Sequence, residues 1–215
     1  MKWIGITGGI ATGKSTVSKI IQDLGGVVVD ADQLAREVVA PGTFGLGSLV
    51  QIFGPVILAR GENTGSKSGG LSGTASSGGA EPALDRAALG KIIFAEADKR
   101  EIVERLLHPL IQRRALEERE KLSNQGLPRA FYDASLIFEK GMKDRFDSVI
   151  LISTSFEVQK SRLMKRDGLS AADAEARIAS QMPLSEKIKL ADHVIENDGD
   201  TAGIRRQVEE LLRKL

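Results

Sequence analysis

The sequence predicts an α/β fold in which helices flank a parallel sheet of five strands. Short apolar runs alternate along the chain with segments of helical periodicity, and this alternation is typical of parallel sheets. We expect the strands at residues 3–6, 27–29, 130–133, 148–153 and 193–196. Since 41% of the 215 residues are hydrophobic, the chain can bury the core that such a domain requires.

The first expected strand runs into a glycine-rich loop with the pattern G-x-x-x-x-G-K-S, and a helix with an apolar face follows the loop. In such loops the backbone N–H groups converge on phosphates, and the helix N-terminus adds positive potential. The loop therefore predicts a bound nucleoside triphosphate. The residues expected to bind it are Gly8, Gly9, Ile10, Ala11, Thr12, Gly13, Lys14, Ser15 and Thr16.

Two residues of the loop have specific expected contacts. Lys14 should reach the β- and γ-phosphates, and Ser15 should offer its hydroxyl to Mg²⁺, which takes few protein ligands. The sequence has no Asn-Lys-x-Asp motif for guanine and no apolar run leading into the Asp-Glu pair of hydrolysing ATPases. These observations favour phosphoryl transfer to a small acceptor.

Asp30 and Asp32 follow the second expected strand, at the sheet edge where ligands bind in open parallel sheets. We expect Asp32 to be the base that takes the proton of an acceptor hydroxyl, and Asp30 to cap or orient. The alternative is that both residues only begin the helix expected over 33–39. Arg36, one turn beyond Asp32, either holds an anionic part of the acceptor or pairs with a neighbouring carboxylate.

The middle of the chain is expected to be helical. Helices are predicted over residues 45–53, 86–94 with Asp85 as N-cap, 97–107 and 110–122, the last two separated by Pro109. Residues 61–79 hold seven glycines and five serines and predict a flexible surface insertion. His108 is either a packed residue at a helix end or a contact of the acceptor.

The last third of the chain supplies two candidate groups. Asp133 ends its strand and either binds Mg²⁺ through water or simply terminates the strand. Arg162 and Arg166 lie four apart on a helix over 157–166, so both can reach one phosphate group from a closing lid; the alternative is a solvated surface pair. Ser170 should cap the next helix, and Thr201 the terminal one.

Composition narrows the possible classes of protein. Thirty basic and twenty-nine acidic residues give a net charge of +1, so no global field draws the chain to nucleic acid or an anionic membrane. The absence of cysteine excludes disulfides and thiolate chemistry. No signal peptide or spanning apolar run is evident, so we expect a cytoplasmic protein.

An ordered series of blocks resembles the dephospho-CoA kinase family over nearly the whole chain outside the insertion. The blocks are Thr7-Gly8-Gly9-Ile10 with Gly13-Lys14-Ser15-Thr16, Asp30-Ala31-Asp32 with Arg36, Pro41-Gly42, Asp85-Arg86 with Leu89-Gly90, His108-Pro109-Leu110-Ile111, Leu136-Ile137-Phe138-Glu139, Gln159 with Arg162, Arg166, Ser180-Gln181-Met182, and Ala191-Asp192 through Asn197. The resemblance implies a P-loop fold like that of nucleoside monophosphate kinases. It also implies ATP-dependent phosphorylation of the ribose 3′-hydroxyl of dephospho-CoA, the last step of coenzyme A synthesis.

The resemblance implies three parts and a role for several residues. The parts are a nucleotide core at 1–30, 130–156 and 190–215, an acceptor-binding region at 31–129, and a lid at 157–189. By similarity Asp32 is the base and Lys14 the phosphate clamp, and Asn197 lies near the adenine. The alternatives are a P-loop kinase of another acceptor, such as a nucleoside monophosphate, and a non-catalytic ATP-gated module. We expect a monomer or weak homo-oligomer.

Three features depart from the family pattern. Ala11-Thr12 replaces the usual Gly-Ser pair, which adds bulk but leaves the required glycines in place. Ser135 stands where a proline is usual, which puts local rigidity in doubt. The Gly/Ser insertion is not a usual feature, and we expect its removal to leave activity intact.

Overall fold

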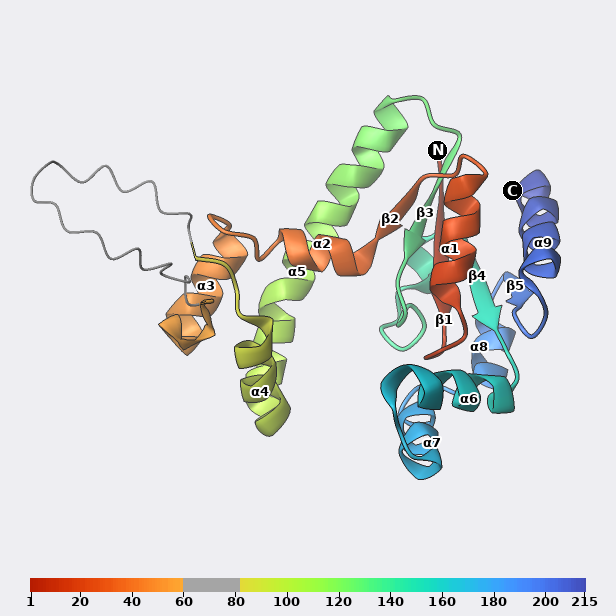
Figure 1. The fold of residues 1–215 in the computed structure, drawn as a ribbon. Helices are drawn as coiled ribbons and strands as arrows, with labels where there is room; N and C mark the ends of the chain where they lie inside the picture. The colour runs from red at the N-terminus through yellow and green to blue at the C-terminus, as the bar shows by residue number, and fades with distance from the viewer. Residues whose placement is uncertain (60–81) are drawn as a thin grey trace, which may run out of the picture. The chain divides into compact units, whose positions relative to one another are not determined.

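The structure is a computed structural model that describes residues 1–59 and 82–215 (Figure 1). The insertion expected at 61–79 lies outside the described residues. The chain divides into two compact units, Met1–Asp32 with Ala115–Leu215, and Gln33–Arg114. Each unit is described by itself below.

The first unit contains the predicted sheet. Its strands are β1 (Lys2–Gly8), β2 (Val28–Asp30), β3 (Arg129–Asp133), β4 (Ser148–Ser153) and β5 (His193–Glu196). They lie in the order β2-β3-β1-β4-β5, and all four neighbouring pairs are parallel. This confirms the predicted five-stranded parallel sheet.

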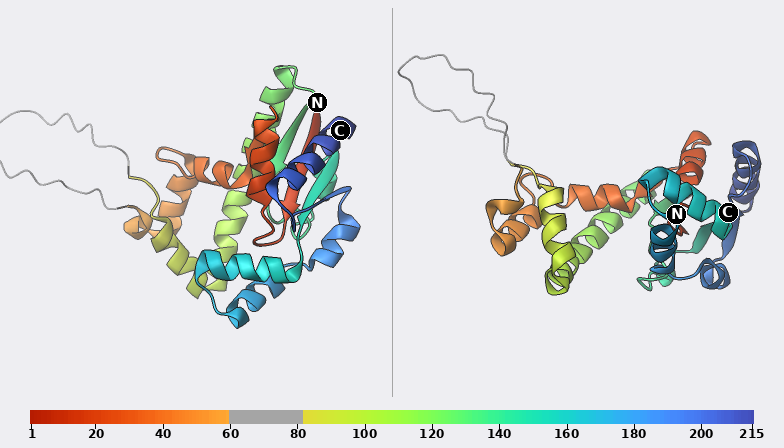
Figure 2. Two further views of the ribbon diagram at one scale, coloured as in Figure 1. Left: turned by 45° about the vertical axis from the view of Figure 1, so that its right-hand side comes forward. Right: turned by 60° about the horizontal axis from the view of Figure 1, so that its bottom comes forward.

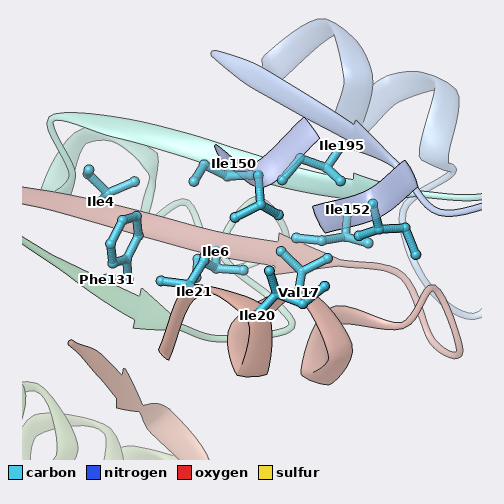
Figure 3. Close-up of a cluster of buried hydrophobic side chains, with 11 residues drawn as sticks. Ile4, Ile6, Val17, Ile20, Ile21, Phe131, Ile150, Ile152 and Ile195 are labelled. Atoms are coloured by element: carbon cyan, nitrogen blue, oxygen red, sulfur yellow. The ribbon is translucent and has the colours of Figure 1, made fainter. Parts of the chain in front are cut away.

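Strand residues alternate between two apolar layers. Ile4 and Ile6 of β1, with Ile150 and Ile152 of β4, form an apolar cluster (Figure 3) that packs against α1 (Lys14–Asp23) and α9 (Thr201–Lys214). These two helices lie side by side (Figure 2). The intervening residues of β4 join a second cluster on the opposite face, formed by Ile137, Phe138, Val149 and Leu151. Both faces of the sheet are therefore covered, as its almost continuous apolar strands require.

Three helices lie between β4 and β5 along the chain. They are α6 (Phe156–Asp167), α7 (Ala171–Ala179) and α8 (Leu184–Leu190); α6 packs on α7, and α8 packs on β4. Ser170 caps α7 as predicted, since its hydroxyl accepts from Asp173 N–H at 3.1 Å. The predicted N-cap of α9, Thr201, was wrong by one residue. The N-cap is Asp200, whose carboxylate accepts from Gly203 N–H at 2.7 Å and so satisfies a free N–H group of the first turn.

The second unit holds most of the remaining helices. They are α3 (Phe44–Phe53), the single turn η1 (Pro55–Ile57), α4 (Arg86–Ala95) and the first part of α5 (Ala97–Asn124); α2 (Ala31–Glu37) begins just before the unit. A further 3-10 turn, η2 (Lys143–Arg145), belongs to the first unit. The core of the second unit is formed by Val39, Leu49, Ile57, Leu89 and Val103.

Two expectations fail in α5. The helices predicted over 97–107 and 110–122 are one continuous helix with Pro109 inside it. Proline removes one N–H bond at a cost of about 3 kcal/mol, and here good helix formers on both sides, with Val103, Leu106 and Leu107 packed in the core of the second unit, outweigh that cost. His108 is accordingly neither at a helix end nor packed, but exposed in the middle of α5.

Candidate active site

The glycine loop connects β1 to α1 at the carboxyl edge of the sheet (Figure 1). Gly13 has φ +84°, and a Cβ there would collide with Nδ2 of Asn197. A Cβ on Gly8 would stand 2.6 Å from Oγ1 of Thr12. Both required glycines are thus fixed by close approach, and Gly13 also by its left-handed backbone.

The loop is bonded internally through Thr12. Its N–H and hydroxyl donate to the carbonyl of Gly9 at 3.3 Å and 2.9 Å, and its own carbonyl accepts from Asn197 Nδ2 at 2.6 Å. Thr12 therefore replaces the family's smaller residue with a side chain that takes part in the loop. The side chain of Asn197, expected near the adenine, is buried beneath this loop.

A cavity of about 470 Å³ brings the loop and both predicted lid arginines together. Its lining comprises Gly9, Ile10, Ala11, Thr12, Gly13, Lys14, Ser15, Ser135, Arg162, Arg166 and Gln181. Backbone donors and cations thus surround one space. A phosphate chain is the ligand that this lining suits.

Lys14 forms an ion pair with Asp133 Oδ1, whose other oxygen accepts from the Ser18 hydroxyl at 2.6 Å. Asp133 also stands in register with Asp30 on the neighbouring strand β2. Both Asp133 oxygens are therefore engaged, one of them by the cation expected to bind phosphate. Sequence reasoning missed Ser18, although its place one helical turn after Lys14 puts both on one side of α1.

Only one of the two terminal nitrogens of the Arg162 guanidinium is hydrogen-bonded to the described part of the protein. Its Nη2 donates to the carbonyl of Asn197 at 2.9 Å, whereas Nη1 is buried and has no hydrogen-bond partner among the described residues. A buried unpaired donor is costly unless a ligand satisfies it. Nη1 lies close to the loop, at 3.6 Å from where a Cβ of Gly13 would stand, so a phosphate oxygen fits this requirement.

Arg166 also lines the cavity but is exposed and paired. Its Nε and Nη2 donate to the two oxygens of Asp167 at 2.7 Å and 3.1 Å. These bonds lower the pKa of Asp167, with a smaller contribution from the charges of Arg166 and Arg177. Phosphate binding by Arg166 would require it to leave Asp167.

Asp32 lies exposed at the start of α2, and its N–H donates to Asp30 Oδ1 at 2.8 Å. Asp30 thus orients the turn that carries Asp32, as expected. Burial raises the pKa of Tyr132 on β3, the charge of Arg145 lowers it, and the charges of Asp30 and Asp32 raise it further. The negative charge of Asp32 therefore acts on the Tyr132 phenol of β3, the strand that ends at Asp133.

The remaining predicted residues belong to the other unit. Arg36 is exposed in the last turn of α2, and His108 is exposed on α5. The neighbour of Arg36, Glu37, pairs with Arg114 at 3.0 Å within this unit. Their role toward the acceptor stays a prediction.

The donor set fits Mg²⁺ in the way expected for a phosphate loop. Within residues 1–59 and 82–215, no group of three or more His, Cys, Asp or Glu side chains could hold a metal by itself. Mg²⁺ keeps most of its waters and binds through substrate phosphates and one or two protein oxygens. Ser15, exposed at the cavity, offers a hydroxyl oxygen, whereas Asp133 would take part only once Lys14 leaves it.

No helix in the described part of the chain is both long enough and apolar enough to span a bilayer.

Comparisons with known proteins point to one family. The sequence model of the dephospho-CoA kinase family matches residues 2–66 and 77–203. A dephospho-CoA kinase of Geobacter sulfurreducens is 43% identical over 214 residues, covering 100% of this chain and 98% of the relative. That of Anaeromyxobacter dehalogenans is 40% identical over 215 residues, covering 100% of this chain and 92% of the relative.

Solved structures give the same result. The crystal structure of TT1252 from Thermus thermophilus has a TM-score of 0.74 and 31% identity, covering 100% of this chain and 97% of that one. Dephospho-CoA kinase from Campylobacter jejuni has a TM-score of 0.69 and 30% identity, with coverages of 99% and 96%. The predicted resemblance is confirmed: the chain belongs to the dephospho-CoA kinase family, ATP-dependent and Mg²⁺-dependent enzymes that phosphorylate the 3′-hydroxyl of dephospho-CoA.

Proposed function

We propose that this chain carries out the dephospho-CoA kinase reaction with the ATP phosphates in the cavity beside its glycine loop, giving CoA and ADP. The observation that supports this most directly is the unpaired, buried Nη1 of Arg162 beside the loop. Phosphoryl transfer requires alignment and charge neutralisation more than covalent help from the protein. The cavity supplies both through backbone N–H groups and three cationic side chains, Lys14, Arg162 and Arg166.

Each cation has a distinct task in the proposed mechanism. Lys14 leaves Asp133 and moves to the β- and γ-phosphates, while Nη1 of Arg162 donates to a phosphate oxygen. Arg166 leaves Asp167 and adds charge as the lid, residues 157–189, excludes water. The Ser15 hydroxyl, and Asp133 through water, would hold Mg²⁺, which would supply neutralisation of the phosphate charge.

Asp32 is the proposed base. Its carboxylate accepts the proton of the ribose 3′-hydroxyl as the oxygen attacks the γ-phosphorus, and the bond to the ADP oxygen breaks. Asp30 holds the turn through its bond to Asp32 N–H. Arg36 and His108 contribute to acceptor binding in the region 31–129, and Asn197 supports the adenine end of the nucleotide.

The test is the Asp32→Asn substitution, which keeps the size of the side chain and removes the base. Turnover should fall about 10²–10⁴-fold, with a nearly unchanged Kd for ATP. The matched control is Asp30→Asn, whose amide oxygen can still accept from Asp32 N–H and should preserve most turnover. Unchanged turnover in Asp32→Asn would remove Asp32 from the mechanism.

The acceptor is tested separately by ADP release with Mg-ATP. Dephospho-CoA should give the highest kcat/KM in a panel with adenosine, AMP and pantothenate derivatives. Preference for a nucleoside monophosphate would favour the alternative kinase. ATP-dependent partner binding that tolerates Asp32→Asn would favour the non-catalytic module.

The remaining partner assignments are part of this proposal. The net charge of +1 supports a protein that binds neither nucleic acid nor an anionic membrane. We assign it to the cytoplasm as a monomer or weak homo-oligomer. Sedimentation of the purified protein, with and without ATP, measures the oligomeric state.

A further inference from the structure

Two glutamines of the lid segment bind the backbone of one loop residue. Oε1 of Gln181, which follows α7, accepts from Ile10 N–H at 2.7 Å, and Nε2 of Gln159 on α6 donates to the Ile10 carbonyl at 2.7 Å. Both polar backbone groups of Ile10 are thus held by side-chain amides. We propose that Gln159 and Gln181 are positioning residues that hold the glycine loop in its nucleotide-binding conformation.

The loop needs such support at the next residue. Ala11 has φ +58° and is the one non-glycine residue with a positive φ among those the structure describes. A Cβ in this region is disfavoured, and such a residue persists only where its surroundings determine its conformation. Glycine, usual in the family here, would not require that support.

The contacts on the two sides of Ala11 are complementary. Before it, the two glutamines hold Ile10; after it, Asn197 Nδ2 donates to the Thr12 carbonyl at 2.6 Å. Ala11 is therefore enclosed between two anchored backbone segments. Loss of the glutamine contacts frees one side and lets Ala11 relax to a negative φ, which changes the course of the loop beside the cavity.

The chemistry of an amide suits this task. A neutral glutamine both donates and accepts hydrogen bonds, so the pair can satisfy the N–H and the carbonyl of Ile10 without adding charge beside the phosphates. Gln159 is 3% exposed, and a buried amide requires a partner. It also lies three residues before Arg162 on α6, so the helix that presents Arg162 to the cavity is tied directly to the loop.

The experiment measures the Kd for ATP without acceptor, by calorimetry on the full chain, beside kcat and KM. This inference rests on ATP binding at the proposed site, and failure of the unsubstituted chain to bind ATP would refute the proposed function itself. Gln181→Ala and Gln159→Ala should each raise the Kd for ATP about fivefold to tenfold, comparable to the penalty for a left-handed alanine. The KM for ATP should rise in parallel, with a smaller change in kcat.

The matched control is Gln207→Ala on α9. Gln207 makes the same pair of bonds, at 3.0 Å each, to the N–H and carbonyl of Glu196, outside the cavity. It should lower thermal stability as the other variants do, with less than a twofold change in the Kd for ATP. An equal rise in Gln207→Ala would overturn the proposal, since any lost glutamine contact would then have the effect.

The decisive variant is Ala11→Gly, which removes the backbone penalty. In the Ala11→Gly background, Gln181→Ala and Gln159→Ala should raise the Kd for ATP at most about twofold, because glycine adopts the left-handed conformation freely. The combination is also a test of folding, since rescue requires a folded protein. An undiminished loss in the glycine background would show that the glutamines contact the nucleotide directly, and would overturn their positioning role.

Discussion

Lys187 and Glu139 form the most deeply buried ion pair among the pairs described in the structure. The Lys187 side chain on α8 is 0% exposed and that of Glu139 is 19% exposed, with 2.6 Å between Nζ and Oε1. The contact is one of charges, since its geometry is not that of a hydrogen bond. Substitution of either partner leaves the other charge buried and uncompensated.

The burial of both charged groups predicts a large cost for either substitution. Breaking a buried pair costs about 3–5 kcal/mol. Lys187→Met and Glu139→Gln should both fall in this range, because the two carboxylate oxygens of Glu139 and the ammonium of Lys187 are all buried. At about 2–4 °C per kcal/mol for a chain of this size, the expected loss in Tm is roughly 6–20 °C for either variant.

Urea unfolding followed by circular dichroism measures both free energies. The double variant Lys187→Met/Glu139→Leu should recover most of the loss, since an apolar pair of similar volume is often as stable as a buried ion pair. A loss below about 1 kcal/mol for either single substitution would refute the assigned burial.

Two further predictions concern the sheet edge and the loop. Burial raises the pKa of Tyr132 above its ordinary value of 10.0, so the phenol stabilises the fold below that pH and loses this contribution as pH rises toward the folded pKa. Tyr132→Phe should therefore lose less stability than the unsubstituted chain on going from about pH 9 to pH 11 in urea titrations, and equal losses would contradict the effect. Gly13→Ala should weaken ATP binding more than about tenfold, since its Cβ meets Asn197. Gly126→Ala, with φ +76° but nothing within 4 Å, should strain the backbone and leave the Kd for ATP unchanged.

The strands and the loop could be predicted from sequence because local pattern determines them. Val149 to Ile152 form an unbroken apolar run, and a strand covered on both faces is the structure that buries such a run. The glycine pattern likewise fixes the loop between β1 and α1, since Gly8 and Gly13 are required by local geometry.

Elements that depend on tertiary packing were predicted less well. Pro109 marked a helix boundary by its local preference, but the good helix formers around it and the packing of Val103, Leu106 and Leu107 carry α5 through it. The short helix α8 was not predicted, because seven residues with three charges show too little periodicity. Its central residue, Lys187, is buried by contact with Glu139, 48 positions earlier, and no local pattern indicates that pair.

The site shows the same division between local and distant causes. The spacing of Arg162 and Arg166 predicts that both can face one phosphate, and both line the cavity. Their states differ for reasons outside that spacing: Asn197, brought in by β5, binds one edge of Arg162 and leaves Nη1 unpaired, whereas the adjacent Asp167 engages Arg166. In the proposed mechanism Arg162 therefore has a donor free for a phosphate, whereas Arg166 would first have to leave the Asp167 carboxylate. Nucleotide binding should consequently depend more on Arg162, and lid closure more on Arg166.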